Sequence, residues 1–302
     1  MKSRPTSQMT LLALLWLVLG VGLPAWVSGC AFKPHQRQRV VGDRVTVLED
    51  TSGTDAGIHN NRGVAKLLQG DARGAVEDFK EAVRLDPQEP GYYENLGWAL
   101  SEARQDRDAL AALDLAVRLS TKDPELYWKR GVVKERLGSY NGAIKDFTEA
   151  LAIDPTLGKA YAERARAKAR LQVFPGAIAD ATDALRLDPT DAAAAQTRGY
   201  ARSQVGALEE ALEDYTHALA VRQGDPTLYV LRADTKARRR DYAGAQADLD
   251  EAIRLRPDSA QAYRLRAEIK QKRGDKSGST ADLEAAARLD LKPGAPTPIP
   301  AR

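Results

Sequence analysis

The sequence predicts an all-helical solenoid built from one helix-turn-helix unit that occurs seven times. The first observation is a fixed interval, because residues 143–155, AIKDFTEALAIDP, return 34 residues later as AIADATDALRLDP at residues 177–189. The second is helical spacing: Ala143, Phe147 and Ala150 stand at i, i+4 and i+7, the apolar stripe of a packed helix. The third is composition, since aromatic residues make up only 6% and helix formers such as alanine and leucine are frequent. A fixed period of this length indicates a repeat architecture.

Residues 1–29 have the layout of a secretory signal and lie outside the predicted fold. Lys2 and Arg4 form a basic start, and an apolar run of 13 residues, 11–23, follows them. This run is too short to span a bilayer as a helix. The signal ends in Val-Ser-Gly before Cys30, the only cysteine in the sequence, and this ending resembles the lipobox of bacterial lipoproteins.

The lipobox resemblance implies a membrane anchor. The mature chain would begin at Cys30, which would carry a diacylglycerol thioether and an amine acylated with a chain such as palmitate. Since burial of each methylene contributes about 0.8 kcal/mol, several acyl chains give lasting attachment. Ala31 follows the cysteine, and in the enterobacterial sorting pattern that this ending resembles, a residue other than Asp permits transfer to the outer membrane. We therefore expect an envelope protein that faces the periplasm from the outer membrane; a buried cysteine in a signal anchor is the alternative.

Residues 30–55 are expected to form a linker between the lipid and the helices. Basic residues are frequent there without helical periodicity, which favours a solvated spacer that contacts anionic headgroups. A second possibility stays open, a short strand if a partner supplies an edge, and it rests on Val40, Val41, Val45 and Val47.

Seven units of 34 residues follow one another without insertion over residues 56–293. Each unit contains two helical patterns, and the units begin at Ala56, Pro90, Pro124, Gly158, Ala192, Pro226 and Ala260. In four units a glycine lies between the two patterns, where a left-handed residue is expected to end the first helix: Gly70, Gly138, Gly206 and Gly274. A proline that cannot continue the second helix follows it at Pro87, Pro155, Pro189 and Pro257.

A small residue recurs inside the first helical pattern of each unit, at Gly63, Gly97, Gly131, Ala165, Gly199, Ala233 and Ala267. With this residue, the alanine that opens the second helix and the closing Ala and Pro, the units resemble tetratricopeptide repeats over 238 of the 302 residues. The place of that family's first-helix tryptophan holds tyrosine at Tyr93, Tyr127, Tyr161, Tyr229 and Tyr263. The resemblance implies a right-handed superhelix whose first helices line a concave groove. Because helices of about 14 residues are marginal alone, they depend on the close approach that Gly and Ala permit.

Six units share charges that predict an ion-pair ladder between their two helices. An arginine precedes the small residue at Arg62, Arg130, Arg164, Arg198, Arg232 and Arg266. A second base follows four residues later at Lys66, Lys134, Lys168, Arg202, Lys236 and Lys270. The second helix supplies the acid at Asp78, Asp146, Asp180, Asp214, Asp248 and Asp282. The second unit has Leu96, Leu100 and Ala112 in these places, so bases and acid disappear together, as a structural network predicts and a basic binding stripe does not.

Two tryptophans stand outside the pattern of the units. Trp98 and Trp128 accompany the packing aromatics Tyr93 and Tyr127, from which they are offset by five residues and one residue. At about 100° per residue these offsets turn both rings off the packing stripe. The resemblance makes them inner-groove positions on adjacent first helices.

We predict that the two tryptophans anchor a partner protein. The expected ligand is an extended segment or helix with an apolar anchor, and each ring is expected to be a hot spot worth about 2 kcal/mol or more. Polar residues near this site are Glu94, Asn95 and Lys129. The alternative is that the rings fill a gap left by Leu96 and Leu100.

One use of such grooves is excluded. By resemblance, receptors for the acidic C-terminal tails of chaperones clamp the tail with Lys and Asn from three successive units. Asn95 and Lys129 occupy two of the matching places, but Asn60, Val64 and Glu125 occupy the other three. Glu125 would repel a carboxylate, so a chaperone-tail receptor is not predicted.

No catalytic, metal or cofactor site is predicted. The three histidines, His35, His59 and His217, have no acid or cysteine at ligand spacing. The formal net charge is +3 and falls to +1 without Lys2 and Arg4, so no global field attracts nucleic acid. An enzyme with a small-molecule substrate is therefore not expected.

Taken together, these features predict a lipid-anchored scaffold or adaptor that binds a partner protein in the bacterial cell envelope. The chain resembles outer-membrane repeat lipoproteins, which include type IV pilus pilotins and scaffolds for cell-wall hydrolases. The alternative is a structural subunit or assembly factor of a secretion, pilus or envelope machine, held by its convex face. Residues 294–302 are expected to form a proline-rich, extended tail.

Overall fold

The computed structural model describes residues 37–41, 44–48 and 53–291. The predicted signal, Cys30 and the tail at 294–302 lie outside the described residues. The predicted pairs of helices are confirmed, because the described residues form fourteen helices, α2 to α15. Their bounds are α2 Asp55–Leu68, α3 Ala72–Leu85, α4 Pro90–Glu102, α5 Asp106–Leu119, α6 Pro124–Arg136, α7 Tyr140–Ile153, α8 Gly158–Arg170, α9 Phe174–Leu187, α10 Ala192–Gln204, α11 Leu208–Val221, α12 Pro226–Arg238, α13 Tyr242–Leu255, α14 Ala260–Lys272 and α15 Lys276–Asp290.

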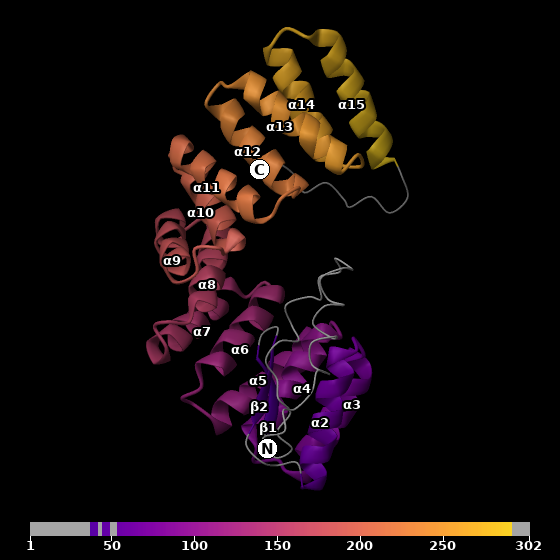
Figure 1. The fold of residues 1–302 in the computed structure, drawn as a ribbon, viewed down its shortest axis with the longest axis vertical. Coiled ribbons are helices and arrows are strands. Elements are labelled where there is room, and N and C mark those ends of the chain that lie inside the picture. The colour runs from indigo at the N-terminus through magenta and orange to yellow at the C-terminus, as the bar shows by residue number, and fades with distance from the viewer. Residues whose placement is uncertain (1–36, 42–43, 49–52, 292–302) are drawn as a thin grey trace, which may run out of the picture.

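The helix pairs stack one after another into an elongated superhelix (Figure 1). The first helix of each pair has an even label and the second an odd label. Successive first helices, such as α4 and α6, lie in contact along the whole series, whereas successive second helices do not come equally close. The solenoid therefore curves toward its first helices, which line the concave face, and the second helices form the convex face.

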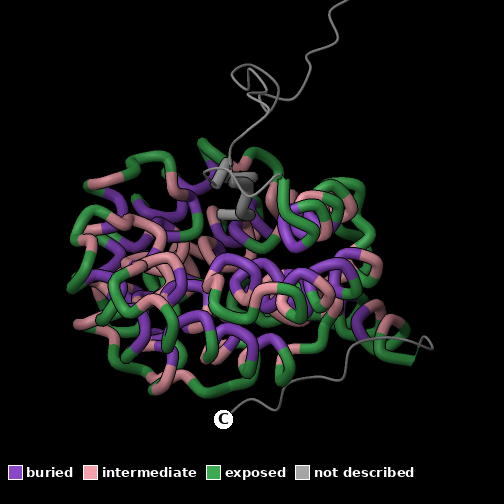
Figure 2. The backbone as a smooth tube through the Cα atoms, turned by 90° about the horizontal axis from the view of Figure 1, so that it is seen from below, coloured by how far each residue is buried: buried purple, intermediate pink, exposed green. Residues whose placement is uncertain are grey.

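The two helices of a unit cross closely because a small residue meets the side chain that faces it. A Cβ added at Gly131 would lie 2.6 Å from the Phe147 ring, so only glycine fits there. One period later the same two places hold Ala165 and Ala181, both fully buried. Where the first helix has glycine at the crossing, the second helix can place a large side chain opposite it; where the fourth unit has alanine, the facing side chain is smaller. In both cases the contact buries apolar surface. Buried and exposed positions alternate along the chain accordingly (Figure 2).

The turn between the two helices has the same backbone conformation in every unit. The four predicted glycines are left-handed there, with φ of 81°, 78°, 85° and 87° at Gly70, Gly138, Gly206 and Gly274. The other three units have non-glycine residues at this place, Arg104, Gln172 and Arg240, with φ of 63°, 59° and 67°. The sequence did not indicate these three, because residues with a Cβ rarely adopt this conformation.

Two strands precede the helices and pair antiparallel, β1 Arg37–Val41 with β2 Arg44–Leu48. Arg37 is opposite Leu48, and Val41 is opposite Arg44. β1 lies beside α2 and α4, two helices of the concave face. The solvated spacer expected over residues 30–55 thus contains a two-stranded hairpin, and its role as a linker stays a prediction. The strand that the valines suggested does form, and the chain itself supplies the second edge.

The predicted ion-pair ladder is present in all six units. In the fourth unit Arg164 Nη2 lies 2.8 Å from Asp180 Oδ1, and Lys168 Nζ lies 2.7 Å from Asp180 Oδ2. The other five triads are Arg62, Lys66 and Asp78; Arg130, Lys134 and Asp146; Arg198, Arg202 and Asp214; Arg232, Lys236 and Asp248; Arg266, Lys270 and Asp282. In the second unit the corresponding Leu96, Leu100 and Ala112 are buried. These charges are therefore a structural network between paired helices.

The ladder arginines also connect neighbouring units, which the sequence did not indicate. Arg164 Nη1 donates a hydrogen bond to Thr148 Oγ1 on the second helix of the preceding unit, at 3.1 Å. The Arg164 guanidinium also lies 5.5 Å from the centre of the Tyr161 ring. The same bridge joins Arg130 to Asp114, Arg198 to Thr182, Arg232 to Thr216 and Arg266 to Asp250. Each of these arginines thus holds two successive second helices at once.

Candidate functional site on the concave face

The concave face of the second to fourth units carries an aromatic pair flanked by cations. The rings of Trp98 on α4 and Trp128 on α6 stack with their centres 6.1 Å apart and an angle of 27° between their planes. Lys159 Nζ on α8 lies 3.9 Å from the centre of the Trp128 ring and 2.6 Å from Glu125 Oε2. Lys129 Nζ lies 5.4 Å from the Trp98 ring centre. The structure therefore brings the predicted tryptophans together and adds Lys159, which the sequence analysis missed.

Three polar residues predicted to lie in the groove are buried between helices instead. Lys129 Nζ lies 2.9 Å from Glu94 Oε1, and their side chains are 0% and 1% exposed. Asn95 Nδ2 donates to Asn60 Oδ1 at 2.7 Å, and this pair is buried as well. Charges removed from water require a partner, and these side chains supply one another across α2, α4 and α6. The prediction that Glu94, Asn95 and Lys129 line an open groove is therefore wrong.

The two tryptophans also contribute to the packing of the helices, in addition to the binding role that was predicted for them. Trp128 is only 7% exposed, and no hydrogen-bond partner for its Nε1 occurs among the described residues. Trp98 is half-buried and contacts the core cluster that includes Leu96 and Leu100. The alternative interpretation, in which the rings fill a gap there, thus accounts for part of their packing. Trp128 is therefore mainly a packing residue, contrary to its predicted place off the packing stripe, and the binding role of the pair stays a prediction.

An acidic group with a raised pKa lies on the next first helix. Glu163 on α8 stands one period after Lys129, and its Oε2 is buried without a hydrogen-bond donor among the described residues. Arg166 Nη2 forms an ion pair with Glu163 Oε2, and Arg166 Nε also donates a hydrogen bond to Glu135 Oε1, at 2.9 Å. Burial raises the pKa of Glu163 from 4.5 to about 7; the charge of Arg166 opposes this rise, and Glu135 and Asp191 add to it. A comparison of equivalent positions would have singled out this carboxyl.

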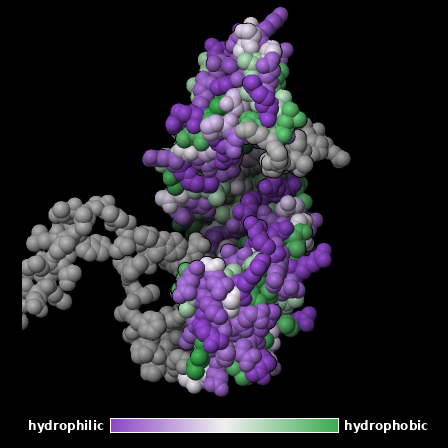
Figure 3. Space-filling model, turned by 90° about the vertical axis from the view of Figure 1, so that its right-hand side faces the viewer, coloured by the Kyte–Doolittle hydropathy of each residue, from purple (hydrophilic) through white to green (hydrophobic). Residues whose placement is uncertain are grey.

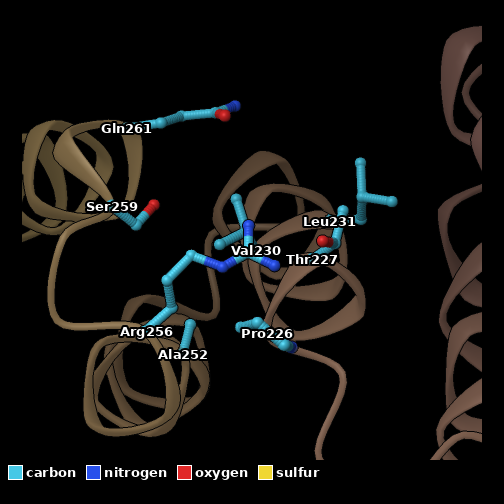
Figure 4. Close-up of a pocket in the computed structure, with 8 residues that line it drawn as sticks. All are labelled: Pro226, Thr227, Val230, Leu231, Ala252, Arg256, Ser259 and Gln261. Atoms are coloured by element: carbon cyan, nitrogen blue, oxygen red, sulfur yellow. The ribbon is translucent and has the colours of Figure 1, made fainter. Parts of the chain in front are cut away.

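A small pocket lies at the other end of the concave face, between α12 and α14 (Figure 4). Its volume is about 70 Å³. Val230 and Leu231 of α12 form apolar walls, and Arg256 at the end of α13 reaches into it. The sequence pattern did not indicate this pocket, although Arg256 stands where the third and fourth units have Asp154 and Asp188.

Hydrophilic side chains dominate the surface shown in Figure 3, and apolar side chains are scattered among them. Within residues 53–291 no helix is both long and apolar enough to cross a membrane. Over the same residues, no three His, Cys, Asp or Glu side chains are grouped in a way that would hold a metal ion.

Comparisons with known proteins agree with this fold. Models of the tetratricopeptide repeat match residues 56–89, 124–157 and 230–296. No protein of curated function matches the sequence. The helix pairs in these matched ranges are therefore tetratricopeptide repeats, and the described residues form a right-handed superhelical solenoid of seven helix-turn-helix units.

Several solved structures have a similar fold. A tetratricopeptide repeat protein from Parabacteroides merdae has a TM-score of 0.63 and 22% identity, over 78% of this chain and 93% of its own. PilF of Pseudomonas aeruginosa has a TM-score of 0.58 and 17% identity, over 66% of this chain and 91% of its own. YrrB, described as having an unusual peptide-binding site, has a TM-score of 0.53 and 24% identity, over 62% of this chain and 96% of its own. At such identities the likeness concerns the fold alone.

Proposed function

We propose that this chain is a scaffold or adaptor of the bacterial cell envelope that binds a segment of another protein on its concave face. Lipid on Cys30 attaches it to a membrane, and the residue after Cys30 favours the outer membrane, with the solenoid in the periplasm. The signal layout of residues 1–29 and the lipobox-like ending before Cys30 support this anchor.

The observation that carries the binding proposal is the half-buried ring of Trp98 on the concave face. The second unit already has its packing aromatic at Tyr93, so the unit does not need a second large ring for its own core. Stacking on the buried Trp128 fixes the orientation of the Trp98 ring before any ligand arrives. A rigid, partly exposed tryptophan loses little conformational entropy on binding and is the residue type most enriched among hot spots.

The surroundings of the ring favour a peptide or helix with one apolar anchor. Charged side chains of α6 and α8, Glu125 and Lys159, stand beside Trp128, and Lys129 lies near the Trp98 ring. An apolar centre with a polar rim is the usual anatomy of a protein interface. The peptide-binding site ascribed to YrrB supports a peptide as a suitable ligand for this fold.

Site-specific photocrosslinking tests this proposal. A photoreactive phenylalanine analogue at position 98 is expected to capture a partner in the envelope of the source cells. The same analogue at Leu115, an exposed residue of the convex helix α5, is expected to capture none. A conjugate that forms only at position 115 would favour the alternative function, a structural subunit held by its convex face.

Substitutions supply the matched control. Trp98→Ala is expected to weaken partner binding at least tenfold while the solenoid stays folded, since the ring is only half-buried. Tyr200→Ala removes an aromatic ring three periods later, at the equivalent position of α10, and is expected to leave binding unchanged. Trp128→Phe replaces the buried ring without opening a large cavity. Unchanged binding by Trp98→Ala, with circular dichroism and melting as in the wild type, would contradict the proposal.

A further inference from the structure

The pocket between α12 and α14 contains Arg256. The equivalent arginine of the preceding unit, Arg222, has side-chain partners, and Arg256 has lost them. In the fifth unit Arg222 Nη2 donates to Gln196 Oε1 at 3.4 Å, and its Nη1 lies 3.4 Å from Asp225 Oδ2. One period later the three equivalent residues are Arg256, Val230 and Ser259. The cation is therefore kept while both of its acceptors are replaced.

Neither replacement restores a partner. Val230 has no acceptor, and the Ser259 hydroxyl oxygen accepts a hydrogen bond from the Ala262 backbone N–H, at 3.3 Å, to cap α14. Among the described residues no side-chain hydrogen bond or ion pair of Arg256 occurs, and the residue is exposed. Figure 4 shows its side chain extending from the end of α13 toward Val230 and Thr227 of α12. The guanidinium thus stands against an apolar wall with its five donors unused.

We propose that Arg256 binds an acidic side chain in a segment of another protein, and that a neighbouring aliphatic side chain of that segment enters the pocket. An arginine recognises a carboxylate with two parallel hydrogen bonds, which fixes direction as well as charge. The apolar walls of Val230 and Leu231 suit an aliphatic group, and the small volume of about 70 Å³ favours a short side chain such as Val, Leu or Ile. Residues 292–302 contain no Asp or Glu, so charge complementarity points away from the chain's own tail. This inference deepens the proposed function, because it adds a second contact on the same face and names the chemistry of the partner there.

Peptide display tests the inference. A library of random twelve-residue peptides on phage is selected on the immobilised full chain. The wild type is expected to enrich peptides with Asp or Glu at a fixed spacing from Val, Leu or Ile. Arg256→Glu is expected to enrich Lys or Arg at that place, and Arg256→Gln to lower the affinity of the wild-type peptides at least tenfold.

Two matched variants separate recognition from general charge. Arg254→Glu reverses a nearby exposed arginine that already pairs with Glu251, and it is expected to select the same peptides as the wild type. The double variant Val230→Gln and Ser259→Asp gives Arg256 the acceptors that Arg222 has, and it is expected to lose the peptides although the cation remains.

The inference is overturned if the wild type enriches no acidic peptide, if Arg256→Glu keeps the wild-type peptides, or if Arg254→Glu changes selection equally. Thermal melting of each variant establishes that the solenoid is folded. These outcomes are independent of the tryptophan test. Loss of capture by Trp98→Ala together with unaltered selection by the Arg256 variants would leave the proposed function standing and remove this second contact.

Discussion

At the scale of single residues, Glu163 is a group whose ionisation opposes folding. Its pKa is raised from 4.5 to about 7 in the folded chain, so between these values the folded state binds a proton more tightly than the unfolded state. Stability therefore falls as the pH rises from 4.5 to about 7, and the whole penalty is present above that value. This pH dependence of stability is opposite to that caused by a carboxyl whose pKa is lowered by a salt bridge. Such a carboxyl stabilises the fold at neutral pH, and its contribution is lost in acid.

Glu163→Gln removes the charge and keeps the shape of the side chain. We expect it to raise the free energy of unfolding by about 2 kcal/mol at pH 8 and to change it little at pH 5. Urea denaturation at the two pH values measures the difference. Glu149→Gln, at an exposed position of α7, serves as the control and is expected to have no effect at either pH. A gain that does not depend on pH would contradict the argument.

At the scale of the helix pair, the ladder makes a quantitative prediction because the chain contains its own reference. Asp180→Ala leaves the guanidinium of Arg164 and the ammonium of Lys168 partly buried without their carboxylate. We expect a loss of about 2–3 kcal/mol in the free energy of unfolding. Adding Arg164→Leu and Lys168→Leu copies the second unit, with Leu96, Leu100 and Ala112, and should recover most of that loss.

Urea denaturation of the single and the triple variant measures this recovery. If the two leucines lower the free energy of unfolding further, the result contradicts an energetic coupling between the acid and the bases. The second unit itself shows that the apolar solution packs well, since Leu96 is 9% and Leu100 is 4% exposed.

The helix pairs and the ladder could be predicted from the sequence because both depend on contacts inside one unit. Arg164 and Asp180 are 16 residues apart, and the same spacing recurs in six units, so the pattern itself shows which charges belong together. The buried pairs Asn60 with Asn95 and Glu94 with Lys129 are 35 residues apart, each joining two units. Their burial depends on how far one unit rotates against the next, and no spacing within a unit determines that rotation. This is why the burial of these groove residues could not be predicted.

At the scale of the whole molecule, the two proposed contacts lie toward opposite ends of the concave face, with the tryptophans in the units nearer to Cys30 and the Arg256 pocket in the last two units. A partner that spans both contacts would meet the anchored end at the tryptophans. If Cys30 carries the proposed lipid, the anchor contributes to the geometry of binding, because the tryptophans lie in units that follow Cys30 closely in the sequence.

Cys30→Ser is the test of that anchor. Labelled palmitate is expected to enter the wild type and not the variant, and the variant is expected to keep its signal segment, because lipid attachment and normal processing both require Cys30. Equal labelling of the two proteins would contradict the lipid assignment. The helices should melt identically in both proteins, since Cys30 lies outside residues 56–293.

A left-handed residue ends every first helix, and this turn determines the fold of the unit independently of the residues that bind a partner. The chain reverses in the same backbone conformation whether glycine, arginine or glutamine stands there, as at Gly138, Arg104 and Gln172. Side chains on the inner face take no part in that reversal, so the turn is the same in units with different inner-face residues. Substitutions can therefore change the binding surface of one repeat at a time. A duplicated repeat would keep the same fold, while its surface residues could still diverge.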